Sequence, residues 1–326
     1  IAQLKQKVAE HSELDVTTLP YNQPLIDWLK EEKECGKKII LCTAANEKIA
    51  EAVVGNFDLF DAFIASDSKT NLKSARKRDA LQQRYGDNGY DYAGNSNDDL
   101  EVWSGASNAI VVNASEYVLQ KASKLTSVTQ VFLSERAGIA VWLRALRIHQ
   151  WLKNLLLFVP LLAAHQIGNS QSLGLLVIAF LSFSLCASSV YITNDLLDLE
   201  SDRSHPRKRA RPFASAKLSV LHGVIAAPLL IAASFLLGTV VGLEFLIVLL
   251  VYLLLTVTYS FYLKRLVLVD CLTLATLYTM RIIAGAAAVS VSLSFWLLAF
   301  SIFIFLSLAL VKRNAELLVQ SREGKN

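Results

Sequence analysis

The pattern of apolar and polar positions divides the chain into two parts. Up to about residue 126, charged and apolar residues alternate over short distances, as they do in soluble domains. From about residue 151, long runs of Leu, Val, Ile, Ala and Phe predominate, and six segments approach the length of a membrane-spanning helix. These segments are 153–165, which is the shortest, 173–193, 219–241, 244–262, 268–289 and 293–311.

This division predicts a multidomain protein. We expect an α/β domain over residues 1–120, a linker over 121–146 and an all-α, multi-span transmembrane bundle over 147–326. In the first domain, an apolar run at 38–45 ends in small residues and is followed by a helical pattern, which indicates a buried parallel strand and a crossover helix. Further short runs at 62–65, 90–93 and 109–112 alternate with helical stretches such as 73–84, so the pattern favours a Rossmann-like α/β domain with a parallel sheet.

The charges of the connections predict an orientation in the membrane. The connection 194–217 and the pair Lys264-Arg265 are basic, and Lys312-Arg313 follows the last apolar segment, whereas the other connections lack Lys and Arg. By the positive-inside rule, the first domain and the basic loops face the cytoplasm of a multi-pass plasma-membrane (inner-membrane) protein. The net charge of +4 is explained by these boundary bases, so we predict no nucleic-acid partner.

A row of acids lies at the end of the second apolar segment. On a helix, Asn194, Asp198 and Asp202 fall four residues apart, and Asp195 shares their face. Clustered carboxylates repel one another, and a hard divalent cation such as Mg²⁺ relieves that repulsion while it binds substrate phosphates. Basic residues that suit the same phosphates follow at once: Arg203, Arg207, Lys208, Arg209 and Arg211. The alternative is a solvated loop whose bases set topology or contact anionic lipids, but topology does not require a row of acids.

Two further basic residues lie inside apolar segments or at their boundaries. Arg281 lies within the fifth segment, where it suits a phosphate ligand or a partner of the acids, or alternatively a structural ion pair within the bundle. Lys153 follows Trp151 at the membrane boundary, where it either anchors the chain at the interface or lines a polar cavity.

The acid row resembles a known motif. Asn194-Asp195-x-x-Asp198-x-x-x-Asp202 with its basic Arg-Pro ending resembles the first Asp-rich motif of the UbiA-type superfamily of intramembrane prenyltransferases, and Arg147, Trp151, Lys153 and Asn154 resemble its entry to the first span. The superfamily has nine spans, so the resemblance implies that 147–326 holds about six of them. Because Ile1 is also not an initiator residue, we expect a fragment that is truncated at both ends.

Departures from the superfamily pattern point to one branch. Where the second Asp-rich motif usually has two acids, Asp270 is alone and position 274 is Leu. The basic run 205–212, Arg281 with its flanking residues to Gly285, and the stretch 312–317 resemble the polyprenyl-phosphate phosphoribosyltransferase branch. That resemblance implies a Mg²⁺-dependent transfer of 5-phosphoribose from 5-phosphoribosyl 1-diphosphate to a polyprenyl phosphate in the lipid bilayer.

The resemblance also implies roles for the candidate residues. Asp195, Asp198 and Asp202 would be catalytic metal ligands, and Asp270 would be a catalytic residue that holds a second metal or a hydroxyl. The substrate- and phosphate-binding set would be Asn194, Lys153, Arg203, Arg207, Lys208, Arg209, Arg211, Lys264 and Arg281.

Two other functions remain open. One is prenyl transfer from a polyprenyl diphosphate to an aromatic acceptor such as 4-hydroxybenzoate. The other is a membrane transporter or a non-enzymatic scaffold, although a transporter would typically show Gly- or Pro-broken spans placed symmetrically in two halves.

The first domain resembles the haloacid dehalogenase superfamily of phosphoryl-transfer enzymes. Thr43 follows the first strand and matches the second motif of that family, Lys77 matches the third, and Asn95 with Asp99 matches the acidic fourth. The Asp-x-Asp nucleophile motif would lie upstream of Ile1, and Asn95 stands where the family commonly has Asp. An active phosphatase and a vestigial or regulatory domain therefore both remain open, and Thr43 and Lys77 also suit a strand cap and a solvated helix residue.

Overall fold

The computed structural model describes residues 15–322 with the exception of 69, 134–137, 167 and 264–265. The chain forms two units, Ile1–Arg136 and Ala137–Asn326. The stretch 121–146, which the sequence assigned to a linker, contains the last strand of the first unit and the first helix of the second.

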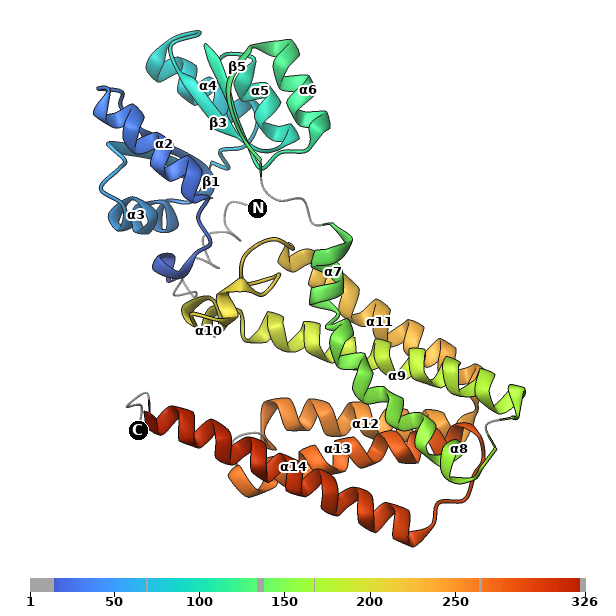
Figure 1. Ribbon diagram of the computed structural model, residues 1–326. Helices are drawn as coiled ribbons and strands as arrows, with labels where there is room; N and C mark the ends of the chain where they lie inside the picture. The colour runs from blue at the N-terminus through green and yellow to red at the C-terminus, as the bar shows by residue number, and fades with distance from the viewer. Residues whose placement is uncertain (1–14, 69, 134–137, 167, 264–265, 323–326) are drawn as a thin grey trace. The chain divides into compact units, whose positions relative to one another are not determined.

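Short parallel strands and the helices between them build the first unit (Figure 1). In chain order, its elements are η1 (Val16–Thr18), α2 (Gln23–Glu34), β1 (Ile40–Asn46), α3 (Glu47–Asn56), β2 (Ala62–Ser66), α4 (Ala75–Tyr85), β3 (Asp91–Gly94), η2 (Asn97–Asp99), α5 (Leu100–Trp103), β4 (Asn108–Val112), α6 (Glu116–Leu125) and β5 (Ser127–Phe132). The predicted parallel pairing is confirmed. The described strands form two sheets, β1-β2 and β3-β4-β5, where the pattern predicted a single sheet.

Local chemistry explains the turns from strand to helix in this unit. The side chain of Asn46 accepts a hydrogen bond from the backbone N–H of Lys48 and so caps α3, and Ser115 caps α6 in the same way through Val118. Trp103 is fully buried, and its indole N–H donates to the carbonyl of Tyr92 at 2.8 Å. This bond fixes α5 against β3, which places the polar residues that follow β3.

The second unit is all-helical (Figure 1). Its elements are α7 (Ile139–Ala145), η3 (Ile148–Phe158), α8 (Val159–Ala163), α9 (Ser170–Leu197), α10 (Leu199–Ser204), η4 (Lys208–Ala210), α11 (Val220–Val241), α12 (Leu243–Phe261), α13 (Val267–Ala288) and α14 (Phe295–Arg322). Within the described residues, five helices are long and apolar enough to cross a membrane: α9, α11, α12, α13 and α14.

The first of the six predicted spans is wrong as a full-length helix. Residues 148–163 form the 3₁₀-helix η3 and the short α8, which together are too short to be a candidate span. The physical reason is that the apolar run itself is short, covering only 155–164 between Asn154 and His165. Trp151 donates to Ser188 and Asn154 donates to Ser184, both on α9, so the segment packs along α9.

Small and hydroxylated residues bring the helices of the bundle close together. On α9, Ser182 donates to the carbonyl of Ser234 on α11 at 2.8 Å, Ser234 returns the bond at 2.7 Å, and Ser189 donates to Ala227 at 2.7 Å. Small side chains and interhelical hydrogen bonds are the usual means of helix association in lipid. They hold the C-terminal end of α9, which carries the acid row, in a fixed place.

Gly285 marks the closest approach in the bundle. A Cβ at this position would overlap the backbone carbonyl of Leu157 on η3, and backbone atoms cannot move aside as a flexible side chain can. The contact holds α13 against η3.

We expect Gly285→Ala to destabilise the second unit by about 1–3 kcal/mol, which is typical of an overpacked core position. The matched control is Gly174→Ala on α9, where a Cβ would meet no atom within 4 Å. Thermal unfolding of the full chain in detergent measures both variants. A midpoint for Gly285→Ala equal to that of the wild type would contradict the close approach.

Candidate functional site

Two carboxylates of the acid row are buried at the end of α9. Asp195 lies in the last turn of α9, and Asp202 lies in α10, with side chains that are 3% and 1% exposed. Asp198 lies between the two helices and is half-buried. The break at Asp198 turns the chain so that Asp195 and Asp202 meet the same basic side chain.

That side chain is Arg211, whose guanidinium bridges the two carboxylates. Its Nη1 lies 3.1 Å from Oδ1 of Asp195 and 2.6 Å from Oδ2 of Asp202. Arg147 adds a second contact to Asp195, with Nη2 2.5 Å from the same Oδ1, and Nζ of Lys208 lies 3.9 Å from Oδ1 of Asp202. The two carboxylates therefore converge on one cationic nitrogen.

This geometry fits a divalent cation of the kind held by few protein ligands. Oδ1 of Asp202 is buried and has no hydrogen-bond partner among the described residues. Mg²⁺ is often bound by one or two carboxylates, with water and substrate phosphates completing its shell. Across the described parts of the chain, no three His, Cys, Asp or Glu side chains are grouped to hold a metal, so the structure brings together two of the three predicted ligands.

The other basic residues between 203 and 209 have few partners among the described residues. Arg207 and Arg209 are exposed, and Lys208 is 43% exposed. Arg203 is half-buried, and its Nε has no partner among the described residues. Exposed cationic ends beside two buried carboxylates suit an anionic ligand that approaches from solvent.

Asn194 and Asp270 are joined to neighbouring residues of α12. Asn194 donates to the hydroxyl of Ser260 at 3.0 Å, and the next residue back, Tyr259, donates to Asp270 at 2.7 Å. These bonds connect the ends of α9, α12 and α13. Lys264, the remaining base expected here, lies outside the described residues.

Arg281 is buried in a separate group of uncharged partners. Its Nε donates to Asn154 at 2.9 Å, Nη1 donates to the carbonyl of Leu277 at 2.5 Å, and Nη2 donates to the hydroxyl of Tyr252 at 3.4 Å. The guanidinium also faces three rings at 5.1 to 5.7 Å, which belong to Phe183, Tyr252 and Tyr278. Among the described residues, Arg281 makes no ion pair with a carboxylate.

Lys153 also lies near the ring of Tyr278. Its Nζ is 5.6 Å from the centroid of that ring, and its side chain is half-buried. Lys153 and Arg281 therefore share an aromatic neighbour, and both place positive charge near the packing of η3 against α13.

The sequence alone did not identify Arg147 as a partner of the acid row. It lies 48 residues before Asp195, stacks over Tyr191 at 4.7 Å and has a left-handed backbone with φ of +52°. The only sequence signal was its place in the pattern that resembles the entry to the first span. Similarly, Tyr259 and Ser260 became site neighbours only through the packing of α12.

In the first unit, the structure joins three of the four haloacid dehalogenase-like candidates, Lys77, Asn95 and Asp99. Lys77 donates to the hydroxyl of Tyr92 at 2.8 Å, and Tyr92 donates to Asp99 at 2.9 Å. The other oxygen of Asp99 accepts from the backbone N–H groups of Asn95 and Ser96. Burial alone would raise the pKa of Asp99, but these hydrogen bonds and Lys77 outweigh it and hold the pKa below its usual range.

Thr43 has a local role in this geometry. Its hydroxyl accepts a hydrogen bond from the backbone N–H of Ala45 at 3.0 Å, within the part of β1 between Cys42 and Asn46 where the register with β2 shifts. The role that the resemblance implies for Thr43 stays a prediction.

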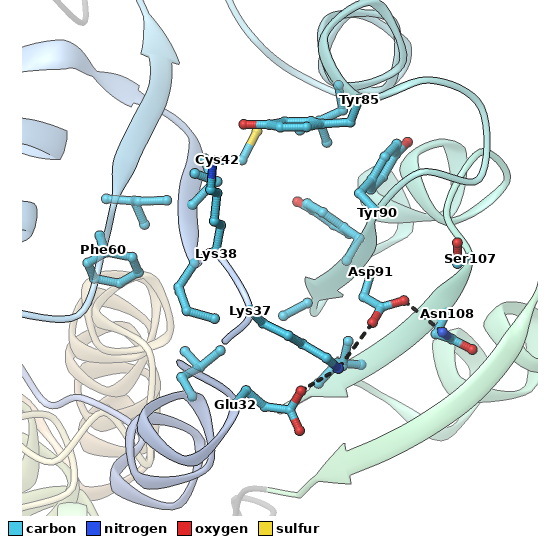
Figure 2. A pocket seen from close by; sticks show the side chains of 18 of the residues that line it. Glu32, Lys37, Lys38, Cys42, Phe60, Tyr85, Tyr90, Asp91, Ser107 and Asn108 are labelled. Atoms are coloured by element: carbon cyan, nitrogen blue, oxygen red, sulfur yellow. Dashed lines mark hydrogen bonds and ion pairs between the residues drawn. The ribbon is translucent and has the colours of Figure 1, made fainter. Parts of the chain in front are cut away.

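A cleft of about 760 Å³ separates β1 from β3 and is lined by both strands. Figure 2 shows Lys37 between Glu32 and Asp91, and Asn108 joined to Asp91. Cys42, Tyr85 and Tyr90 line the same cleft. Burial raises the pKa of the Cys42 thiol to about 11, so this thiol is protonated at neutral pH.

Several known proteins resemble this chain, and one family model matches most of its second unit. The model of the UbiA prenyltransferase family matches residues 155–324. The uncharacterized protein y4nM of Sinorhizobium fredii is 36% identical over 314 residues, which are 96% of this chain and 61% of y4nM. The nodulation protein NoeC of Azorhizobium caulinodans is 42% identical over 55% of this chain and 58% of NoeC.

A third relative has a name that states an activity. The decaprenyl-phosphate phosphoribosyltransferase of Mycolicibacterium smegmatis is 36% identical over 186 residues, which are 56% of this chain and 58% of the relative. The chain thus spans about three fifths of the length of these curated relatives.

The buried carboxylate of the first unit gives a test of its charge. Because the folded pKa of Asp99 lies below the unfolded value of about 4, its ionisation stabilises the unit above that pH, and this contribution is lost as the pH falls below about 4. We expect Asp99→Asn to lower the free energy of unfolding of the unit at pH 7 by about 1–3 kcal/mol. The stability of this variant should also fall less steeply as the pH drops below about 4.

Hydrogen–deuterium exchange of peptides from β3 and β4, in urea titrations of the full chain, measures this change. Asp98→Asn is the matched control, because Asp98 is exposed and pairs with Lys73 at the surface. Equal effects of the two substitutions would show that the buried network around Asp99 contributes nothing specific.

Proposed function

We propose that this chain, which belongs to the UbiA prenyltransferase family, is part of a membrane transferase that moves 5-phosphoribose from 5-phosphoribosyl 1-diphosphate to a polyprenyl phosphate. One observation carries the proposal: two buried carboxylates, Asp195 and Asp202, converge on a single cation position at the end of an apolar helix. The similarity to a decaprenyl-phosphate phosphoribosyltransferase supports this choice of substrates.

In this proposal, Asp195 and Asp202 would hold Mg²⁺. Asp198, which lies between them in the chain, would bind the metal through a water molecule. Mg²⁺ would act as a Lewis acid that neutralises charge on the departing diphosphate. Residue Asn194, held by Ser260, orients the ligand shell, and Asp270, held by Tyr259, orients a substrate hydroxyl or a second metal. The difficult step is departure of diphosphate from a carbon that becomes cationic, so a preorganised set of charges is what the reaction needs.

The bases bind phosphate groups in this account. Arg203, Arg207, Lys208 and Arg209 lie next to the carboxylates, and three of them have exposed or partly exposed cationic ends. Lys264, which follows α12 in the sequence, is proposed for the same set. Their charge compensates the phosphates of the donor, which carry more negative charge than one Mg²⁺ neutralises.

The apolar bundle gives the lipid its place. A polyprenyl chain needs a long apolar surface, and α11, α12 and α14 present many exposed Leu, Val, Ile and Phe side chains. Arg281 and Lys153 are proposed to attract the phosphate of this lipid, because the described partners of Arg281 leave its positive charge without a carboxylate. Apolar walls also keep water from the cationic carbon.

The proposed orientation follows from the basic connections. Bases at 194–217 and at 312–313 favour the cytoplasmic side for the acid row and for the first unit. Soluble 5-phosphoribosyl 1-diphosphate would then reach the site from the cytoplasm.

For the first unit, we propose a haloacid dehalogenase-like fold without assigning it a reaction. The parallel strands and the Lys77–Tyr92–Asp99 network at the carboxyl end of β3 support that fold. An active phosphatase and a vestigial or regulatory domain both remain compatible with this fold.

Two alternatives make different predictions about products. Prenyl transfer to 4-hydroxybenzoate or a similar aromatic acceptor would use the same carboxylates, but the single Asp270 disfavours it, since users of prenyl diphosphates in the superfamily typically carry a second acid pair. A transporter would move a solute without any covalent product.

The experiment is mass spectrometry of lipids from membranes that contain the full-length protein and Mg²⁺. With polyprenyl phosphate and 5-phosphoribosyl 1-diphosphate, we expect a phosphoribosylated lipid, and we expect Asp195→Asn and Asp202→Asn to reduce its formation by roughly 100-fold or more, since each removes an ionised metal ligand. Glu200→Gln is the control, because Glu200 is exposed on the same helix as Asp202.

Other outcomes would redirect the proposal. Prenylated 4-hydroxybenzoate, formed when a polyprenyl diphosphate replaces the first substrate pair, would establish the aromatic alternative. Full activity of both Asp→Asn variants would show that these carboxylates are not the site.

A further inference from the structure

Arg211 lies between two of the carboxylates that we propose as metal ligands. Nη1 of Arg211 is within 3.1 Å of Asp195 and 2.6 Å of Asp202, and these carboxylates come from two different helices. A cation that binds both carboxylates must lie between them, where the guanidinium nitrogen lies. The two positive charges cannot share that place.

We propose that Arg211 is a built-in counter-cation, which occupies the metal position between Asp195 and Asp202 and leaves it when a divalent cation binds. This inference rests on the proposed function, because it concerns the same site. In addition, the guanidinium of Arg211 and the metal would alternate between the two carboxylates. Arg211 would thus have a different role from the bases that only bind phosphate.

The need for a counter-cation follows from burial. Two ionised carboxylates with side chains 3% and 1% exposed carry a large desolvation penalty unless a positive charge compensates them. Asp202 is only partly compensated in the described state, since its buried Oδ1 accepts no hydrogen bond from the described residues and Lys208 is 3.9 Å away. A divalent cation carries more charge than the guanidinium and can also bind this unpaired oxygen. It therefore binds the two carboxylates more strongly than the guanidinium does.

The two arginines at the site differ in a way that identifies the exchangeable one. Among the described residues, Arg147 pairs with Asp195 and not with Asp202, and it stacks on Tyr191, so it compensates one carboxylate and does not join the two. Arg211 bridges both acids and therefore blocks the space between them.

The chain around Arg211 allows its side chain to move while its backbone stays fixed. The side chain is 29% exposed, so its cationic end has a route to solvent. Two positions later, Phe213 is buried against Val141, Ile192 and other residues, and the carbonyl of Arg211 accepts from Ser215 at 2.8 Å. Because the backbone stays in place, a released guanidinium remains close enough to contact a ligand that binds the metal.

Titration of the purified full-length protein with Mn²⁺ in detergent tests the exchange. The electron paramagnetic resonance signal of free Mn²⁺ reports binding directly, without substrate or turnover. We expect Arg211→Gln to bind Mn²⁺ roughly tenfold more tightly than the wild type, because the metal no longer displaces a charge-assisted hydrogen bond. In metal-free buffer the same variant should unfold at a lower temperature, and Mn²⁺ should restore its stability.

Matched variants separate this effect from a general change of charge. Arg144→Gln removes one positive charge from an exposed residue of the same unit and should leave the Mn²⁺ affinity unchanged. Arg211→Lys keeps the charge but replaces the rigid guanidinium, whose Nη1 contacts both acids, with a strongly hydrated ammonium on a flexible stem, so its affinity should fall between those of the wild type and Arg211→Gln. If Arg211→Gln does not fold without metal, Arg211→Lys carries the test.

The outcomes distinguish this inference from the proposed function. If the wild type binds one Mn²⁺ that Asp202→Asn abolishes, while Arg211→Gln and Arg211→Lys bind it no more tightly, Arg211 is a fixed structural partner and the exchange is wrong although the metal site stands. If no variant shows Mn²⁺ binding that depends on Asp202, the metal site itself is wrong, and the exchange is wrong with it.

Discussion

The neutralisation of two buried carboxylates is the constraint on which the membrane unit depends. Asp195 and Asp202 lie at the end of a long apolar helix, where uncompensated negative charge would be strongly unfavourable. Arg147, from a segment 48 residues earlier in the chain, and Arg211, from the following loop, supply the compensation. The arrangement of η3, α9 and the loop after α10 is therefore tied to the same charges that would bind a metal.

The packing of the bundle serves this arrangement. Hydroxyl groups on α9 bond to carbonyls of α11, and the absence of a side chain at Gly285 lets α13 approach η3. The same approach brings Arg281 to Asn154 and to a group of aromatic rings. A second positive group is thus held within the bundle by uncharged partners, as an anionic lipid substrate would require.

The sequence predicted those features that local patterns determine. Apolar runs located four of the strands and the five long helices, and the acid spacing placed Asp195 and Asp202 on one side of the chain. It did not predict β5, because most residues of Ser127–Phe132 are exposed and the stretch lacks a clear apolar run. The segment 148–163 was misjudged because its apolar run, 155–164, is short, and the bonds of Trp151 and Asn154 to serines on α9 appear only in the packed bundle. The pairing of the acids with arginines also depends on tertiary structure, since neither Arg147 nor Arg211 lies at helix spacing from its partners.

Anomalous X-ray scattering from crystals of the full-length protein with Mn²⁺ would test the central claim most directly. We expect one manganese peak between the carboxylates of Asp195 and Asp202, with the guanidinium of Arg211 displaced from the position that bridges them. A peak elsewhere in the bundle, with Arg211 still bridging both carboxylates, would contradict it.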